Sequence, residues 1–342
     1  MAPSRSESGS ASGSSSCLSP RSPSSTLSSA TSQVSIARGP WADEPWPLFE
    51  TPGKTHNAAH PAIHIANETT HTYNAMLRGI NSIFLQAPFV TAAQDVSDFL
   101  FLTHCLGCWI AQHHKALYSR VYPKYEAILG QPGVLATSSP SQSQEEDLSF
   151  LPVLEALIHY AAETQPQPQT YDPAVLLGLL DDLAPGLHAH AFAQIVKAIS
   201  MEPLCGEPGT PAAERRAVGL LNAWRALEAE AGAAPDRPSV LPMLVRLRDT
   251  TFEGGNDWPR LPVLAVHAIA DRLSPAHAGA WRFLPCNVWG KPRELPFLAA
   301  ASSSVAAEPK GKGKGVAWGS GFTSTGTQSS SQSFLSPTPL ST

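Results

Sequence analysis

The chain has 342 residues, of which 42% are hydrophobic and only 15% are charged. A net charge of −5 offers no basic surface to a nucleic acid or to an anionic membrane, so we expect neither as a partner. No apolar run approaches the ~20 residues that span a bilayer, and five scattered cysteines favour a reducing compartment, so the chain is predicted to be cytoplasmic.

The two ends of the chain differ in composition from its middle. Residues 1–40 are rich in Ser, Pro and Thr, and residues 301–342 are rich in Ser, Gly and Thr. Such segments bury too little apolar surface to offset chain entropy, so both tails are predicted to be disordered. Between them we assign residues 60–200 to a helical bundle, and residues 201–300 to a helical and extended C-terminal extension that packs on it.

Four long amphipathic segments make up the predicted bundle. The first, residues 61–87, opens with Pro61 and carries apolar residues three and four apart, and Pro88 ends it. The second covers residues 95–129 and is interrupted by Pro123, and the third begins near Gln144. The fourth covers residues 173–199 with a kink at Pro185. Long amphipathic segments with short polar connections are typical of an antiparallel four-helix bundle.

The C-terminal extension is less regular. Residues 211–231 form a clear further helix that starts at a proline. Residues 240–250 fit either a helix or a strand, and residues 259–273 fit a short helix. Residues 279–298 are rich in Pro and Trp and are predicted to be extended.

Histidines and carboxylates recur on the predicted helices. His64, Glu68 and His71 follow one another at spacings of four and three, which places them on one stripe of the first helix. The second helix has the adjacent pair His113 and His114, the third has Asp147, and the fourth has His188 and His190 with Gln194 after them. Metal centres in helix bundles use inward-facing residues of these types. The alternative is that most of them are ordinary polar-face histidines. No catalytic motif accompanies them, so no enzymatic activity and no catalytic residue is predicted.

Several stretches resemble the hemerythrin-like domain proteins of fungi. ANETTHTYNAMLRGINSIFLQAP (66–88) resembles the first helix of that group, and DVSDFLFLTHCLGCWIAQHHKALYSRVYP (95–123) resembles the second. LDDLAPGLHAHAFAQI (180–195) resembles the fourth helix, while TFEGGNDWP (251–259) and GAWRFLPCNVWGKPRELPFL (279–298) resemble a C-terminal extension. The resemblance implies a hemerythrin-like up-down four-helix bundle.

In that family, histidines and carboxylates from the four helices hold two iron ions, which bind dioxygen or serve in sensing or storage. The resemblance places Tyr73 where the first-helix histidine stands, with His71 two residues away. It places Leu117 and Tyr118 at the carboxylate positions that follow His113 and His114. At the remaining ligand positions it places Asp147, Leu151, His190 and Gln194. Apolar residues, among them Leu151 and Phe192, are then expected to fill the space of the metal.

These replacements predict a degenerate member of the family, a non-enzymatic binding or scaffold protein without a cofactor and with an unidentified protein or small-molecule partner. The alternative is a protein that binds iron or another divalent metal weakly, for oxygen binding, sensing or iron storage. Its metal ligands would come from His71, His113, His114, Asp147 and His190.

Overall fold

The computed structural model describes residues 42–135, 148–232, 237–255 and 258–298. The regular elements in these ranges are helices, apart from an isolated antiparallel bridge between Cys286 and Pro292, which confirms the all-α prediction. The two predicted tails, residues 1–40 and 301–342, lie outside the described ranges. None of the helices described is long and apolar enough to cross a membrane.

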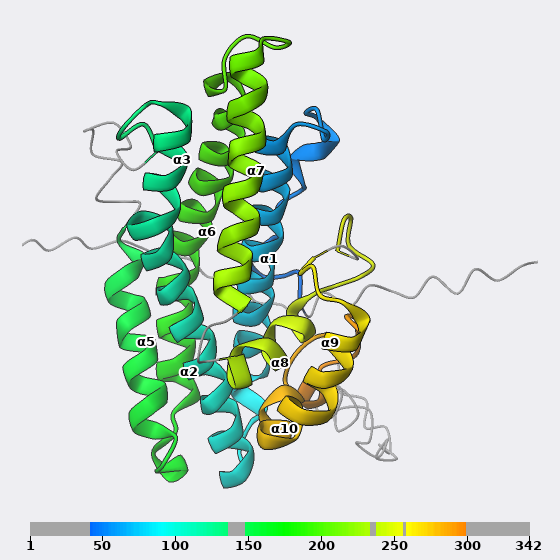
Figure 1. The fold of residues 1–342 in the computed structure, drawn as a ribbon. Coiled ribbons are helices and arrows are strands. Elements are labelled where there is room, and N and C mark those ends of the chain that lie inside the picture. The colour runs from blue at the N-terminus through cyan, green and yellow to red at the C-terminus, as the bar shows by residue number, and fades with distance from the viewer. Residues whose placement is uncertain (1–41, 136–147, 233–236, 256–257, 299–342) are drawn as a thin grey trace, which may run out of the picture. The chain divides into compact units, whose positions relative to one another are not determined.

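Helix α1 (Pro61–Gln86) is the most deeply buried element. It starts as predicted at Pro61, and the preceding His60 caps it by accepting a hydrogen bond from the Ala62 amide at 3.2 Å. Of its 26 residues, 20 are buried. A helix that is buried on all sides belongs to the interior of a domain. Helices from both the bundle and the C-terminal extension pack on α1 (Figure 1).

The second predicted helix is continuous but changes its winding. Helix α2 (Ala93–Ala116) passes into the π-helical turn η3 (Leu117–Val121) and then into α3 (Tyr122–Leu129). Within the turn, the amide of Tyr122 donates to the carbonyl of Leu117, five residues back. Pro123 has no amide hydrogen, and its ring would clash with the preceding turn of an α-helix. The wider π-helical turn before it accommodates both the missing hydrogen bond and the ring. The predicted interruption at Pro123 is confirmed.

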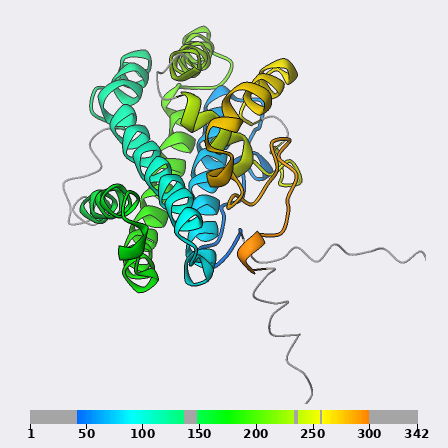
Figure 2. The same cartoon turned by 90° about the horizontal axis from the view of Figure 1, so that it is seen from below.

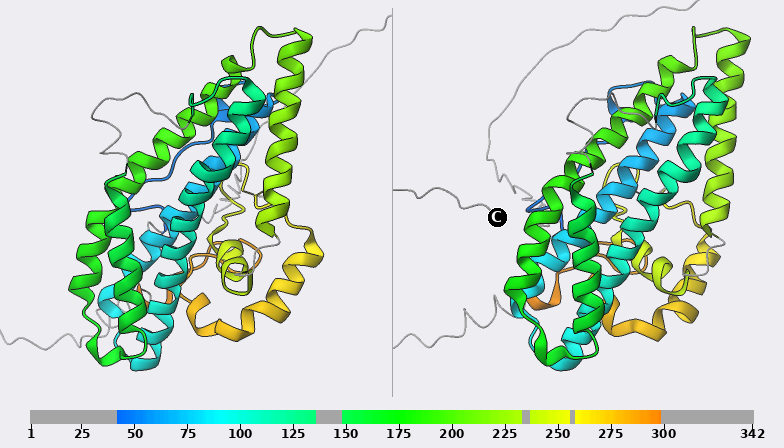
Figure 3. Two further views of the ribbon diagram at one scale, coloured as in Figure 1. Left: turned by 60° about the vertical axis from the view of Figure 1, so that its left-hand side comes forward. Right: turned by 90° about the vertical axis from the view of Figure 1, so that its left-hand side faces the viewer.

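Helix α5 (Phe150–Thr164) and helix α6 (Pro173–Leu204) complete the set of long helices. The start predicted near Gln144 lies outside the described residues, and after a turn at residues 148–149 the helix begins at Phe150. Pro185 lies inside α6, which continues past the predicted end at Ile199. Helix α1 packs along α6, α2 along α5, and α5 along α6, as the side views and the view along the helices show (Figures 2 and 3).

The C-terminal extension covers α1 and α2 from the outside. Helix α7 (Pro211–Gly232) packs on α1 and α3, and helix α8 (Arg237–Leu247) resolves the ambiguous segment as helical. Helix α9 (Val263–Ala268), the turns η5 (Ile269–Leu273) and η6 (Ser274–His277) and the short helix α10 (Ala278–Trp281) follow. Residues 279–298 are therefore helical at their start and irregular afterwards. Trp281, in α10, is buried in the core that α2 helps to form.

An N-terminal strap, residues 42–54, crosses the outside of α1 and α6. Asn74 accepts a hydrogen bond from the Phe49 amide at 2.9 Å and donates to the Phe49 carbonyl at 2.9 Å. Asn81 does the same with Trp46, and Asn67 accepts from the Gly53 amide at 2.8 Å. The three asparagines recur every seven residues, which is two helical turns, so they form one stripe along α1. Their side-chain amides form hydrogen bonds with the backbone of the strap, as the backbone of a neighbouring strand would.

Between Asn74 and Asn81, Arg78 and Gly79 also hold segments of the fold together. Arg78 joins the strap to the C-terminal extension, because its Nε lies 3.2 Å from Asp43 and its Nη2 lies 3.7 Å from Asp249. Gly79 lets α2 approach closely, since a Cβ at this position would lie 2.8 Å from the side chain of Leu106. Asn74, Arg78, Gly79 and Asn81 are therefore residues that hold segments of the fold together.

Candidate functional site

Three of the histidines predicted as metal ligands come together inside the bundle. His113 and His114 lie in the last turn of α2, and His190 faces them from α6. His114 Nδ1 and His190 Nε2 are 3.5 Å apart. The ring of Tyr73, from α1, meets His113 edge-on at 5.4 Å and His190 at 6.0 Å between centroids. Tyr73 and the three histidines form what we call the histidine cluster.

Hydrogen bonds extend the histidine cluster along α6. Gln194 is buried, and its Nε2 lies 3.3 Å from His190 Nδ1 and 3.4 Å from the Tyr118 hydroxyl. The amide oxygen of Gln194 accepts a hydrogen bond from the Tyr122 hydroxyl. Lys197, one turn further along α6, places its ammonium over the rings of Tyr118 and Tyr122, at 5.6 and 5.7 Å from their centroids. This arrangement is a cation–π contact.

His113 is the member of the cluster whose charge state is most constrained. Burial, and to a smaller extent the neighbouring His190 and His114, lower its pKa from 6.5 to about 4. Desolvation penalises the charged form of an imidazole, and nearby like charges add to the penalty. His113 is therefore neutral at physiological pH.

The other predicted ligands lie elsewhere. His71 faces the C-terminal extension, where its ring stacks on Trp258 at 6.2 Å and meets Phe252 edge-on at 6.2 Å. A Cβ at Gly254 would lie 2.8 Å from His71 Nε2, so the extension is in close contact with the ring. Asp147 lies outside the described residues. Within those residues, no three His, Cys, Asp or Glu side chains are grouped so that they could hold a metal ion.

The predicted apolar filling of the metal space is partly wrong. Leu117 is buried and lies next to the histidine cluster, whereas Leu151 is only half-buried. Phe192 is 59% exposed and lies near Phe49 of the strap, so it fills no interior space. Phe192 is two residues from His190, and two residues are about 200° of helical rotation, so the side chains of Phe192 and His190 point to opposite sides of α6.

The stripe of His64, Glu68 and His71 on α1 is real, but it does not face the histidine cluster. Glu68 Oε1 lies 4.0 Å from His64 Nε2 and 3.8 Å from Arg260 Nε. Arg260 belongs to the C-terminal extension, so this stripe, like His71, is turned toward that extension. The ion pair of Glu68 with Arg260 joins α1 to the extension.

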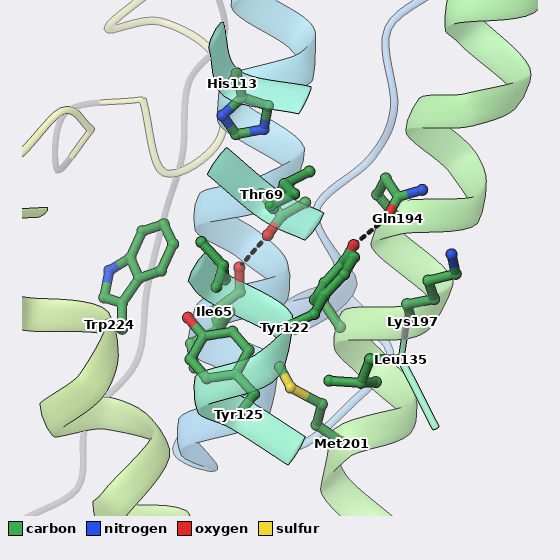
Figure 4. A pocket seen from close by; sticks show the side chains of 13 residues that line it. Ile65, Thr69, His113, Tyr122, Tyr125, Leu135, Gln194, Lys197, Met201 and Trp224 are labelled. Atoms are coloured by element: carbon green, nitrogen blue, oxygen red, sulfur yellow. Dashed lines mark hydrogen bonds between the residues drawn. The ribbon is translucent and has the colours of Figure 1, made fainter. Parts of the chain in front are cut away.

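A narrow pocket adjoins the histidine cluster at the level of the π-helical turn (Figure 4). It contains about 420 Å³ of space between atoms, including its mouth to solvent, but only about 30 Å³ admits the centre of a water molecule. Helices α1, α2, α3, α6 and α7 and the turn η3 all contribute to its wall. The lining residues are Ile65, Thr69, His113, Leu117, Val121, Tyr122, Tyr125, Leu135, Gln194, Lys197, Ala198, Met201 and Trp224.

Tyr122 and Tyr125 of this region were missed by the sequence reasoning, although Tyr118 was named. Tyr118, Tyr122 and Tyr125 follow His114 at spacings of four, four and three, which is one stripe of a helix. That spacing was readable in the sequence. No comparable signal marked Trp224, because it reaches the pocket from α7, far away in the sequence.

Comparison with known proteins finds one curated relative to report. The chain is 28% identical, over 272 residues, to the dimeric xanthone biosynthesis cluster protein R11 of Cryptosporiopsis sp. (strain 8999). The matched region covers 78% of this chain and 97% of that protein. No protein-family model matches the chain. No solved structure matches it either.

Proposed function

We propose that this chain is a hemerythrin-like up-down four-helix bundle that has lost its di-iron centre and acts as a non-enzymatic binding protein. Its binding site is the pocket beside the histidine cluster. The bundle consists of α1, α2 with α3, α5 and α6, and the C-terminal extension covers it. The cysteine usage described above favours a cytoplasmic location for this activity.

The observation that carries the proposal is the position of Tyr73. The family resemblance aligns Tyr73 with a metal-ligating histidine, and its ring lies against both His113 and His190. The side chains at two further ligand positions are Leu117, which is apolar, and Gln194, whose amide is engaged by His190 and Tyr122.

These residues do not fit a pair of iron ions. Two irons carry several positive charges, which anionic bridging carboxylates normally offset. The described residues of the histidine cluster and its hydrogen-bonded neighbours include no carboxylate, and they include the ammonium of Lys197. Two iron cations in this region would be repelled by this ammonium and would have no carboxylate to stabilise them.

A single divalent ion is the second candidate, and one contact favours it. His114 Nδ1 and His190 Nε2 face each other at 3.5 Å, and two neutral imidazoles are suitable ligands for zinc. Two histidines leave at least two positions of a tetrahedral ion to other groups, so such binding would be weak.

The curated relative supports a small-molecule ligand. Its name assigns it to a biosynthesis cluster for dimeric xanthones, and xanthones are planar aromatic ketones. We propose that this chain likewise takes part in the biosynthesis of an aromatic compound, and that it binds such a compound rather than transforming it. No nucleophile paired with a base lines the pocket.

Iron loading tests the loss of the di-iron centre. The protein is purified anaerobically, loaded with ferrous iron, desalted and exposed to oxygen, and its iron content and visible spectrum are measured. We expect well under one iron per chain and no oxo-bridged absorption band. Two irons per chain with such a band would overturn the proposal.

A further inference from the structure

We infer that the pocket beside the π-helical turn binds a planar aromatic molecule through a carbonyl or phenolic oxygen, to which the Tyr125 hydroxyl donates a hydrogen bond. This inference names the ligand class of the binding protein proposed above and rests on that proposal. It is carried by the polar atoms, the charge and the rings of the pocket lining (Figure 4).

Two buried polar atoms in the lining lack a hydrogen-bond partner in the protein. Tyr125 is 2% exposed, and no described residue hydrogen-bonds its hydroxyl. The Nε2 atom of His113 is likewise buried, and no described residue hydrogen-bonds it. His113 as a whole residue is half-buried. Buried polar groups are hydrogen-bonded in the large majority of cases, so two such atoms in one pocket indicate a place for a polar guest.

A buried polar group without a hydrogen-bond partner lowers the stability of the fold, so its presence indicates a role in binding. An unsatisfied buried hydroxyl destabilises a protein, and a phenylalanine at position 125 would fill the same space without that cost. A tyrosine that is unsatisfied in the protein alone but useful to a ligand is the pattern expected of a binding site.

The charge of the lining selects an acceptor over a donor. Among the described residues that line the pocket, Lys197 is the only cation, and none is Asp or Glu. Burial raises the pKa of the Tyr125 phenol, so this hydroxyl stays protonated and donates. Lys197 disfavours an ammonium group, and Glu228, which also raises the pKa of Tyr125, disfavours an anion at its hydroxyl, so a neutral oxygen is favoured.

The remaining walls fit a flat apolar body. Tyr122, Tyr125 and Trp224 contribute aromatic rings, and aliphatic residues such as Ile65 and Met201 fill most of the gaps between them. Aromatic rings favour stacked or edge-on contacts with another ring. Trp224 lies across the pocket from Gln194 and Lys197, so a guest between them contacts α7 on one side and α6 on the other (Figure 4).

The size of the pocket sets what must move. The 30 Å³ open to water centres holds about two water molecules, which is less space than an aromatic ring needs. An aromatic guest therefore displaces water and shifts side chains at the mouth. Helix α7 forms that side of the pocket through Trp224, and α7 packs on α1 and α3.

Two matched pairs of probes test the inference by titration calorimetry on the full chain. Xanthone and xanthene differ only by a carbonyl in place of a methylene group, and acetophenone and ethylbenzene form the same comparison with one ring. We expect the ketone of at least one pair to bind about tenfold more tightly than its methylene partner, since one hydrogen bond distinguishes them. Equal affinity within both pairs, or binding by no probe, would overturn the inference.

Two variants locate the hydrogen bond. Tyr125→Phe should remove the preference for the ketone while the protein stays folded, because no protein group depends on that hydroxyl. Tyr171→Phe is the matched control, since its hydroxyl donates to the Ala87 carbonyl away from the pocket, and the ketone preference should persist. A preference that survives in Tyr125→Phe would refute the role of Tyr125. These results are independent of iron loading, so the ligand class and the loss of the di-iron centre fail separately.

Discussion

The ring of Tyr73 meets the ring of His113 edge-on, with their centroids 5.4 Å apart. This contact places a phenol from α1 against an imidazole from α2 in the interior of the bundle. The family resemblance aligns Tyr73 with a metal-ligating histidine. The contact is therefore the structural basis for proposing that a metal centre was replaced by packed rings and amide hydrogen bonds.

Restoring ligands at two positions tests this assignment. The double variant Tyr73→His, Gln194→Glu places an imidazole against His113 and His190 and adds a carboxylate one turn from His190. We expect it to bind zinc at micromolar or lower concentration, because four nitrogen and oxygen ligands suit a tetrahedral ion. Zinc uptake is measured by a competition assay with a coloured chelator.

The control for this experiment keeps the ring and omits the ligand. Tyr73→Phe with the wild-type Gln194 should take up no more zinc than the wild type. If the double variant folds, by circular dichroism, and still takes up no zinc, then Tyr73 does not occupy a former ligand position.

Removing the Tyr125 hydroxyl should not weaken the fold. Tyr125→Phe is expected to raise the free energy of unfolding by up to about 1 kcal/mol, because a buried group without a protein partner is removed. Tyr171→Phe should lower it by about 1 kcal/mol, because the bond to the Ala87 carbonyl is lost. Urea unfolding measures both. A clear loss of stability in Tyr125→Phe would mean that the hydroxyl supports the fold.

Acid should destabilise the protein through His113. The pKa of His113 is about 4 in the fold and 6.5 without burial, so the unfolded chain binds the proton first as the pH falls. The contribution of neutral His113 is therefore present above pH 6.5 and is lost progressively toward pH 4. Between pH 7 and pH 5 this loss amounts to about 2 kcal/mol.

The pH dependence is assigned to His113 by substitution. Urea unfolding at pH 7 and pH 5 should show a smaller loss in His113→Gln than in the wild type, by about 2 kcal/mol. His159→Gln, on the exposed face of α5, should behave as the wild type. An identical pH dependence in His113→Gln and the wild type would contradict the burial of a neutral imidazole at this site.

The asparagine stripe predicts a graded effect on the N-terminal strap. Asn81→Ala should cost about 3 kcal/mol, since Asn81 makes bonds to Ala42 and Trp46 at buried atoms. Asn67→Ala should cost about 1 kcal/mol, because Asn67 accepts one hydrogen bond from the strap, from the Gly53 amide. Limited proteolysis should cut residues 42–60 faster in the same order. If Asn81→Ala and Asn67→Ala had equal effects on stability and proteolysis, the strap would be held by its own side chains and not by hydrogen bonds from the asparagines.

Much of the fold was readable from proline and periodicity. Pro61 starts α1 and Pro123 interrupts the second helix, because proline lacks the amide that a helix interior requires. The segment 240–250 stayed ambiguous, because a short apolar run does not reveal whether a helix or a strand buries it; its residues up to Leu247 lie in α8.

The candidate site was readable only in part. The sequence paired His71 with the cluster histidines, but Tyr73 is the residue that reaches them, because positions two apart lie on opposite sides of a helix. Periodicity could not tell which face of α1 looks inward, since the C-terminal extension buries the other face as well. The seven-residue recurrence of Asn67, Asn74 and Asn81 was visible in the sequence. Its meaning depended on the strap lying beside it.

The central claim is that the histidine cluster holds no metal, and thermal unfolding with added metal tests it most directly. The unfolding midpoint is measured after treatment with a chelator, and again with excess ferrous iron and with excess zinc. A metal bound at a hundredfold excess over its dissociation constant would add about 2.7 kcal/mol, which is a rise of about 5–10 °C for a chain of this size. We predict that added metal shifts the unfolding midpoint by less than about 1 °C, which is on the order of the measurement error. A rise that disappears in His114→Ala or His190→Ala would contradict the account.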